Sequence, residues 1–191
     1  MEEGYIKFTC DWKRSRLTAN ISELIAARNR VFDMGLIGTY PDGIGFGNIS
    51  IREKKFIISG SATGGVARAG QQHFTRVLDY DFDKNWLLCE GPAKASSESL
   101  THAAVYESDP NINAVIHVHS KEMWERLKGR VPAAREDISY GTPEMGYEVK
   151  RLFSETDVAK KGVFIMLGHE EGVVVFGRNL DLAESTLKSL F

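Results

Sequence analysis

Two histidines with one residue between them, His117 and His119, lie in an apolar, β-branched stretch of the chain. Side chains at positions i and i+2 of a β-strand point to the same face of the sheet. A strand here would therefore direct both imidazoles toward one point, and imidazole nitrogens are good ligands for divalent transition metals. Catalytic zinc sites commonly use three protein ligands and leave one position for water or substrate. His169, far along the chain, is the best candidate for the third ligand.

A second candidate group is formed by Ser96, Ser97 and Glu98, at the expected start of a helix. The free N–H groups and partial positive charge of a helix N-terminus attract anions. Two interpretations remain open. The group is either a helix cap with an acidic first turn, or a site where the serines bind a phosphate or carboxylate while Glu98 works near the metal. Ser61, in a loop of small residues, offers a further hydroxyl to an anion.

Two other patterns resemble known motifs but lack an essential feature. Acidic residues alternate over 79–85 as in an EF-hand calcium loop, yet Lys84 occupies the position where the sharp turn requires glycine. We predict a polar hairpin turn there instead. The alternating glycines of 43–47 do not have the spacing of a dinucleotide-binding loop.

Composition limits the class of protein. The chain has 191 residues, of which 42% are hydrophobic and 26% charged, which is typical of a globular protein. A net charge of −2 gives no sign of a nucleic-acid or membrane partner. Two cysteines without a CxxC motif fit a reducing compartment. Residues 1–5 do not begin a signal peptide, and no apolar run is long enough to span a membrane, so we predict a cytoplasmic protein.

The elements that must position the candidate residues follow from periodicity and turn signals. Expected helices cover 21–36, ending near Gly38, then 97–108, entered through a cap by Ser96 and Ser97, and 121–128, 143–153 and 180–190. Expected strands cover 48–52, 55–58, 74–80, 86–90, 113–119, 163–167 and 172–176. Strands that precede, separate and follow helices predict a layered α/β fold. The hairpin-like spacing of the early strands indicates a mixed sheet rather than a parallel one.

Five short motifs occur in the order found in one known family. They are Gly47-Asn48-Ile49-Ser50-Ile51-Arg52, Ile57-Ile58-Ser59-Gly60, Ala95-Ser96-Ser97-Glu98 with His102 and Tyr106, Ile116-His117-Val118-His119-Ser120, and His169 with Gly172 and Gly177. In this order they resemble the class II aldolase/adducin family, which includes fuculose-phosphate, rhamnulose-phosphate and ribulose-phosphate enzymes. The resemblance extends over residues 20 to 188.

The resemblance implies a three-layer α/β/α fold with a mixed, largely antiparallel central sheet. We expect one such domain over residues 1–191. Members usually assemble as a ring-shaped homotetramer with active sites at subunit interfaces. By the same resemblance, His117, His119 and His169 are expected to bind zinc or another divalent transition metal, and Glu98 is the expected acid/base residue. The expected phosphate-binding residues are Asn48, Ser96 and Ser97, with Ser61 a less secure member.

The implied activity is that of a lyase in carbohydrate metabolism. It would cleave a small sugar phosphate or related polyol through a metal-stabilised enediolate, releasing a three-carbon ketose phosphate or its unphosphorylated analogue and an aldehyde. Dehydration or epimerisation would use the same intermediate, and an adducin-like interaction module without catalysis is a further alternative.

The chain departs from the family pattern at two places. The segment 130–142 is shorter than its counterpart in the sugar-phosphate aldolases, where a tyrosine acts as an acid from the neighbouring subunit; Tyr140 is the candidate substitute. The usual His-Gly is replaced by His169-Glu170-Glu171-Gly172.

Overall fold

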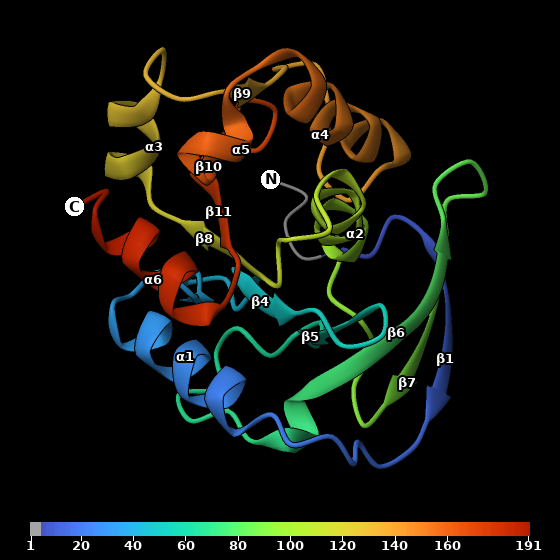
Figure 1. Cartoon of the computed structure of the whole chain (residues 1–191). Coiled ribbons are helices and arrows are strands. Elements are labelled where there is room, and N and C mark those ends of the chain that lie inside the picture. Colours follow the sequence, from blue (N-terminus) through green and yellow to red (C-terminus); the bar gives the residue numbers. More distant parts are fainter. Residues whose placement is uncertain (1–4) are drawn as a thin grey trace.

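A mixed nine-stranded sheet runs through the computed structural model, which describes residues 5–191 (Figure 1). The strands lie in the order β1 (Thr9–Arg14), β7 (Trp86–Gly91), β6 (Phe74–Asp81), β5 (Phe56–Ser59), β4 (Asn48–Ile51), β8 (Ala114–His119), β11 (Gly172–Gly177), β10 (Val163–Met166) and β9 (Ala133–Ala134). Neighbouring strands are antiparallel except for the pairs β1–β7 and β9–β10. A separate small hairpin joins β2 (Gly38–Thr39) to β3 (Gly45–Phe46).

Helices cover both faces of this sheet and bury the two sets of alternating strand residues. The helices α1 (Ser22–Asp33), α3 (Lys121–Leu127) and α6 (Leu180–Lys188) share one apolar core. The helices α2 (Ser99–Ser108), α4 (Pro143–Glu155) and α5 (Val158–Lys161) share the other. Successive residues of β8 divide between the cores, since Val115 packs with α2 and α4 while Ile116 packs on the opposite face. This arrangement confirms the predicted three-layer α/β/α fold with a largely antiparallel sheet.

Most of the expected elements are present, with small shifts at their ends. The first helix stops at Asp33, and Gly35 takes the left-handed backbone conformation that ends it, so the expectation for Gly38 was wrong. The expected turn between β6 and β7 is present as a polar hairpin connection. The prediction for the first residues concerns mostly 1–4, which lie outside the described part of the chain.

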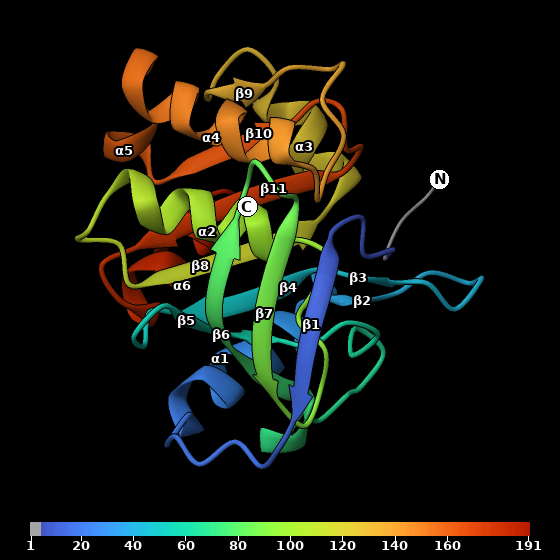
Figure 2. The same ribbon diagram turned by 90° about the vertical axis from the view of Figure 1, so that its right-hand side faces the viewer.

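Strand β1 was not expected from the sequence. It pairs in parallel with β7 and forms one edge of the sheet (Figure 2). Its first five residues alternate between exposed and partly buried positions, with Cys10 and Trp12 packed against the core, but two apolar residues are a short signal.

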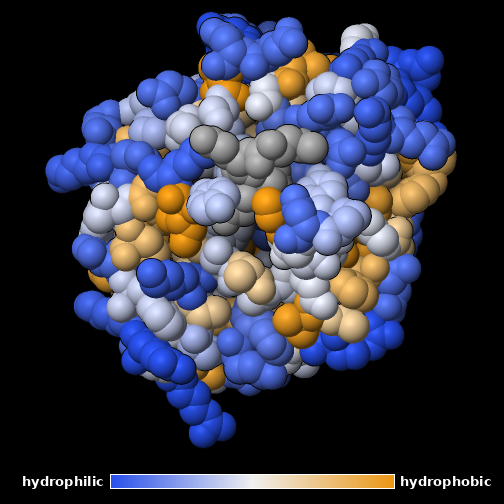
Figure 3. Space-filling view, turned by 180° about the vertical axis from the view of Figure 1, so that it is seen from behind, coloured by the Kyte–Doolittle hydropathy of each residue, from blue (hydrophilic) through white to orange (hydrophobic). Residues whose placement is uncertain are grey.

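The face of the molecule opposite to that of Figure 1 is mainly hydrophilic (Figure 3). Hydrophobic residues are scattered there among polar ones. None of the helices within residues 5–191 combines the length and the apolar character needed to cross a membrane.

Candidate metal centre

The pair His117 and His119 lies on β8, as the sequence pattern predicts, and both side chains are buried. Neighbouring strands set their surroundings, because Asn48 of β4 is opposite His117 and Gly172 of β11 is opposite His119. A Cβ atom at Gly172 would lie 2.8 Å from His169 Cδ2 and 3.4 Å from His117 Nε2. Glycine at this position therefore leaves the space in which the imidazoles approach each other.

His169, in the turn between β10 and β11, joins this pair. The ring centroid of His169 is 5.4 Å from that of His117 and 4.7 Å from that of His119, while the two strand histidines are 4.9 Å apart. One ring nitrogen from each of the three residues lies within 4.8 Å of the others. The structure thus brings together three imidazoles from distant parts of the sequence.

The chemistry of this cluster fits a divalent transition metal. Burial lowers the pKa of His119 to about 3 and holds the pKa values of His117 and His169 well below their usual range. The rings are therefore neutral at pH 7, the state in which imidazole binds metals. Within the described residues, His117 Nε2 and Glu98 Oε1 are buried without a hydrogen bond. Buried polar atoms rarely lack a partner, and a metal ion would supply one to the nitrogen.

Glu98 lies beside the imidazoles at the start of α2. Its carboxylate is 2% exposed, and Oε1 is 3.8 Å from His169 Nε2. The other oxygen, Oε2, accepts a hydrogen bond of 2.6 Å from the hydroxyl of Thr101. Burial raises the pKa of Glu98 to about 7, although the Thr101 hydrogen bond and the charge of Lys7 act in the opposite direction. The carboxyl group can therefore both release and accept a proton near neutral pH.

The predicted serine cap of this helix is wrong. Glu98 itself occupies the N-cap position, and no side chain caps the helix. The Ser96 hydroxyl instead accepts a 3.4 Å hydrogen bond from the Glu98 backbone N–H, within the turn that precedes α2. The turn is buried, so Ser96 and Ser97 face the interior rather than solvent.

The residues expected to bind phosphate lie on neighbouring segments. Asn48 is 5% exposed, and its side-chain nitrogen is 3.4 Å from His117 Nδ1. Gly60 pairs with Ala95, and the Ser61 backbone N–H donates to the Lys94 carbonyl, which sets the loop containing Ser61 beside the segment leading to Ser96. The two segments can approach this closely only because residue 60 is glycine, since a Cβ at Gly60 would lie 2.5 Å from the Ala93 side chain.

Tyr140 and Lys7 also lie at this centre. The Tyr140 ring is 4% exposed, and its centroid is 4.5 Å from that of His169. Lys7 Nζ lies 4.0 Å from the centre of the Tyr140 ring and donates a hydrogen bond of 2.7 Å to the Ser139 hydroxyl. Lys7 comes from the segment before β1, and no sequence signal pointed to it.

Two other contacting residues were missed by the sequence analysis. Thr101 stands three residues after Glu98 on the same helix, a spacing at which helical side chains meet, so its contact was predictable in principle. Tyr40, in the connection between β2 and β3, hydrogen-bonds to His119 Nδ1. Its position depends on long-range packing, and no periodic signal marks it.

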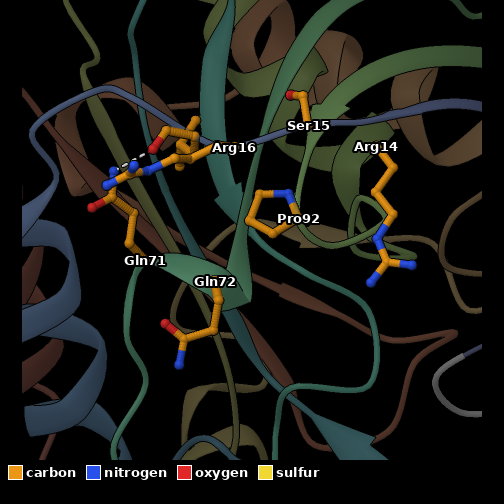
Figure 4. A pocket seen from close by; sticks show the side chains of 7 residues that line it. Arg14, Ser15, Arg16, Gln71, Gln72 and Pro92 are labelled. Atoms are coloured by element: carbon orange, nitrogen blue, oxygen red, sulfur yellow. Dashed lines mark hydrogen bonds between the residues drawn. The ribbon is translucent and has the colours of Figure 1, made fainter.

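A surface cavity of about 450 Å³ lies elsewhere (Figure 4). Its lining contains none of the three histidines and not Glu98. It is formed by Arg14, Ser15, Arg16, Leu17, Gln71, Gln72 and Pro92. This cavity is therefore separate from the chemically distinctive centre of the molecule.

Comparison with known proteins gives the family. The sequence profile of the class II aldolase and adducin N-terminal domain matches residues 23–190. The chain belongs to the class II aldolase and adducin family. The match begins after β1, so both β1 and Lys7 precede the part of the chain that the family profile describes.

Solved structures show that the fold is shared with class II aldolases. L-fuculose-1-phosphate aldolase from Thermus thermophilus has a TM-score of 0.64 and 21% identity, over 87% of this chain and 86% of that one. YgbL from Escherichia coli, described as a putative aldolase/epimerase/decarboxylase, has a TM-score of 0.62 and 18% identity, over 88% and 83%. A sugar-phosphate aldolase from Thermotoga maritima has a TM-score of 0.57 and 16% identity, over 89% and 92%.

Membership of the class II aldolase family agrees with the chemistry of the site. Class II aldolases are metal-dependent, and this chain has a buried histidine triad that could hold a metal ion. The resemblance inferred from the short motifs is therefore confirmed at the level of family and fold.

Proposed function

We propose that this protein is a metal-dependent lyase that cleaves a small sugar phosphate, or a related polyol, by an aldol-type reaction. The observation that carries the proposal is the convergence of three buried imidazoles on one point beside a buried carboxylate. Membership of the class II aldolase family supports the same reaction class.

In this proposal His117, His119 and His169 hold the metal, with zinc as the first choice because it readily accepts three imidazole ligands. When bound, a divalent ion acts as a Lewis acid that stabilises negative charge developing on substrate oxygens. The burial that keeps the three rings neutral also excludes water from the site.

Glu98 is proposed as the acid/base residue. Oε2 is held by the Thr101 hydroxyl, so Oε1 is the oxygen that would give a proton to the carbon next to the substrate carbonyl during cleavage, and would take it back in the reverse condensation. In the metal-free protein burial raises the pKa of this carboxyl to about 7, near the value that suits proton transfer at neutral pH, and a bound divalent cation would lower it. Tyr140, packed on His169, is proposed as the proton-transfer group on the aldehyde side: during cleavage it takes the proton of the hydroxyl that becomes the aldehyde, and in the reverse condensation it donates that proton to the aldehyde oxygen.

The phosphate of the substrate is proposed to bind Asn48, Ser96, Ser97 and Ser61. The amide oxygen of Asn48 is buried without a hydrogen bond, while the amide nitrogen faces His117 Nδ1. If His117 binds the metal through Nε2, its Nδ1 carries a hydrogen and needs an acceptor. The oxygen and the NH₂ group of the Asn48 amide have nearly the same shape, so the amide can be turned by 180°. Its oxygen then accepts the hydrogen bond from His117 Nδ1, and its NH₂ group can donate to an anion.

The biological setting is proposed on the same basis. We expect a cytoplasmic enzyme of carbohydrate metabolism that acts as a homotetramer of single-domain chains spanning residues 1–191.

The proposal can be tested in two steps with purified protein. Metal analysis should find about one equivalent of zinc per chain, lost in His117→Ala. The metal-loaded protein should then catalyse exchange of a carbon-bound proton of dihydroxyacetone phosphate with D₂O, followed by NMR. A screen of phosphorylated ketoses for aldehyde release would then identify the full substrate. Exchange without aldehyde release would favour the dehydratase or epimerase alternative, whereas absence of both metal and exchange would favour a non-catalytic module.

A further inference from the structure

A chain of two hydrogen bonds leads away from one of the candidate metal ligands. The hydroxyl oxygen of Tyr40 is 2.9 Å from His119 Nδ1 and 2.8 Å from Glu171 Oε2. The carboxylate oxygen itself is 4.0 Å from the ring nitrogen, so the phenol lies between the two groups. His119 belongs to β8, Tyr40 to the β2–β3 connection, and Glu171 to the turn after His169.

Chemistry fixes the direction of both hydrogen bonds. An ionised carboxylate only accepts hydrogen bonds, so the single phenolic hydrogen of Tyr40 points to Glu171. The phenol oxygen must then accept from the ring, which places the hydrogen of His119 on Nδ1. The lone pair of neutral imidazole is left on Nε2, the nitrogen on the other side of the ring.

Glu171 occupies a backbone position that a glutamate rarely adopts. Its φ angle is +71°, in the left-handed region that favours glycine. The carbonyl group of Glu171 accepts a hydrogen bond from Ser120 N–H at the end of β8, so the turn is fixed against the strand that carries His119. A strained residue persists where the surrounding structure holds it, and such residues concentrate at functional sites.

The turn that carries Glu171 is the one that carries His169, in the sequence His169-Glu170-Glu171-Gly172. This turn therefore brings a carboxylate to a place from which it reaches a second candidate metal ligand, His119, through Tyr40. The carboxylate is 22% exposed, so water screens its charge only partly.

We propose that Tyr40 and Glu171 are positioning residues that hold His119 as an Nε2 ligand and strengthen its bond to a divalent metal. The proposal rests on the function proposed above, because it requires that the three histidines bind metal. Outer hydrogen bonds of this kind fix the ring orientation and raise the basicity of the ligand nitrogen. Neither residue contacts the metal position or the substrate in this proposal.

The test is a measurement of Zn²⁺ affinity by competition with a chromophoric chelator. Tyr40→Phe removes both hydrogen bonds and should weaken Zn²⁺ binding by about 10- to 100-fold. Glu171→Gln keeps an acceptor for the phenol but loses the charge, so it should weaken binding by a smaller factor.

The variant Glu171→Gly distinguishes a role of Glu171 in positioning His119 from a role in the stability of the fold. Glycine adopts the left-handed conformation without strain, so the metal-free variant should unfold at the same temperature as the wild type or higher. Its Zn²⁺ affinity should nevertheless fall, because the carboxylate is gone. A purely structural role for Glu171 predicts the reverse, with a lower unfolding temperature and unchanged affinity. This variant keeps the proposal testable even if Tyr40→Phe does not fold.

Two matched controls lie away from the centre. Tyr147 also donates a hydrogen bond to a carboxylate, that of Asp83, so Tyr147→Phe removes the same kind of contact. Lys54 has a φ angle of +55°, so Lys54→Gly relieves the same kind of strain. Both controls should bind Zn²⁺ like the wild type.

The outcomes distinguish this proposal from the one on which it rests. If the wild-type protein binds no divalent metal, the proposed metal centre is wrong. If the wild type binds Zn²⁺ and both Tyr40→Phe and Glu171→Gly bind it equally well, the metal centre stands and the positioning role of Tyr40 and Glu171 is overturned.

Discussion

Glu98 and Glu148 are equally buried, at 2% exposure each, but their surroundings give them opposite properties. Glu148 accepts hydrogen bonds from the Arg135 backbone N–H and from two nitrogens of the Arg151 guanidinium, at 3.0, 2.9 and 2.6 Å. These contacts lower the pKa of Glu148, those with Arg151 most of all. Glu98 accepts a hydrogen bond from one neutral group, the Thr101 hydroxyl, and burial raises the pKa of Glu98 to about 7.

The two carboxylates lie on adjacent helices, since α2 packs against α4 (Figure 1). Their difference shows that burial of a charged group does not by itself indicate function. A carboxylate surrounded by guanidinium groups is fixed in its ionised form and supports the structure. A carboxylate beside neutral imidazoles can change its protonation state, and perturbed groups of this kind concentrate at functional sites.

The largest expected difference between the two carboxylates is in proton exchange. Glu98→Gln should retain the metal but slow deuterium exchange into dihydroxyacetone phosphate by about 10²- to 10⁴-fold, the usual contribution of general acid–base catalysis. Glu148→Gln should exchange at the wild-type rate. Equal exchange rates in wild type and Glu98→Gln, measured by NMR at saturating metal, would remove Glu98 from its proposed role.

The second difference concerns stability of the metal-free protein. The pKa of Glu98 is about 7 when folded and 4.5 in its ordinary state, so the folded state binds more protons between these values. The stabilising effect of that proton is complete below pH 4.5 and is lost as the pH rises through 7. Glu98→Gln should therefore match the wild type near pH 4.5 and exceed it by about 3 kcal/mol at pH 8. Urea unfolding at both pH values measures this, and a pH-independent difference would contradict it.

The third prediction concerns Glu148, where the change to glutamine should have the opposite effect on stability. Glu148→Gln removes the buried charge that Arg135 and Arg151 face and leaves Arg151 paired with Glu155 alone, so it should destabilise the protein at pH 7. Both arginines are partly exposed, which limits the loss to about 1–3 kcal/mol. Below the lowered pKa of Glu148 the difference from wild type should disappear, because the wild-type carboxyl is then also neutral. Chemical denaturation at pH 7 and in acid gives both values.

The smallest expected effect comes from Lys7, whose charge lowers the pKa of Glu98. Lys7→Met should raise that pKa by less than about one unit, because the lysine is partly exposed to solvent. The pH at which the Glu98→Gln advantage stops growing, which is set by the folded-state pKa of Glu98, should move upward by the same amount in the Lys7→Met background. A downward movement would show that Lys7 does not act on Glu98 through its positive charge.

Local patterns predicted most of the fold. Alternation and β-branched residues located β8 with His117 and His119, and helical periodicity located α1, α4 and α6. Both signals depend on neighbours in the sequence, which are near one another in any fold. The edge strand β1 was missed because only two partly buried residues, Cys10 and Trp12, alternate with polar ones along it, which is a short signal.

The sequence by itself determined the residue types of the site, namely the imidazole pair, a distant third histidine and a glutamate at a helix start. It also determined the family, since ordered motifs survive where overall identity is low. Only the tertiary structure decided that His169 meets the pair, that Glu98 lacks the arginines that Glu148 has, and that Tyr40 and Lys7 reach the centre. These contacts join segments far apart in the chain, so they depend on how the sheet and its helices pack rather than on local periodicity.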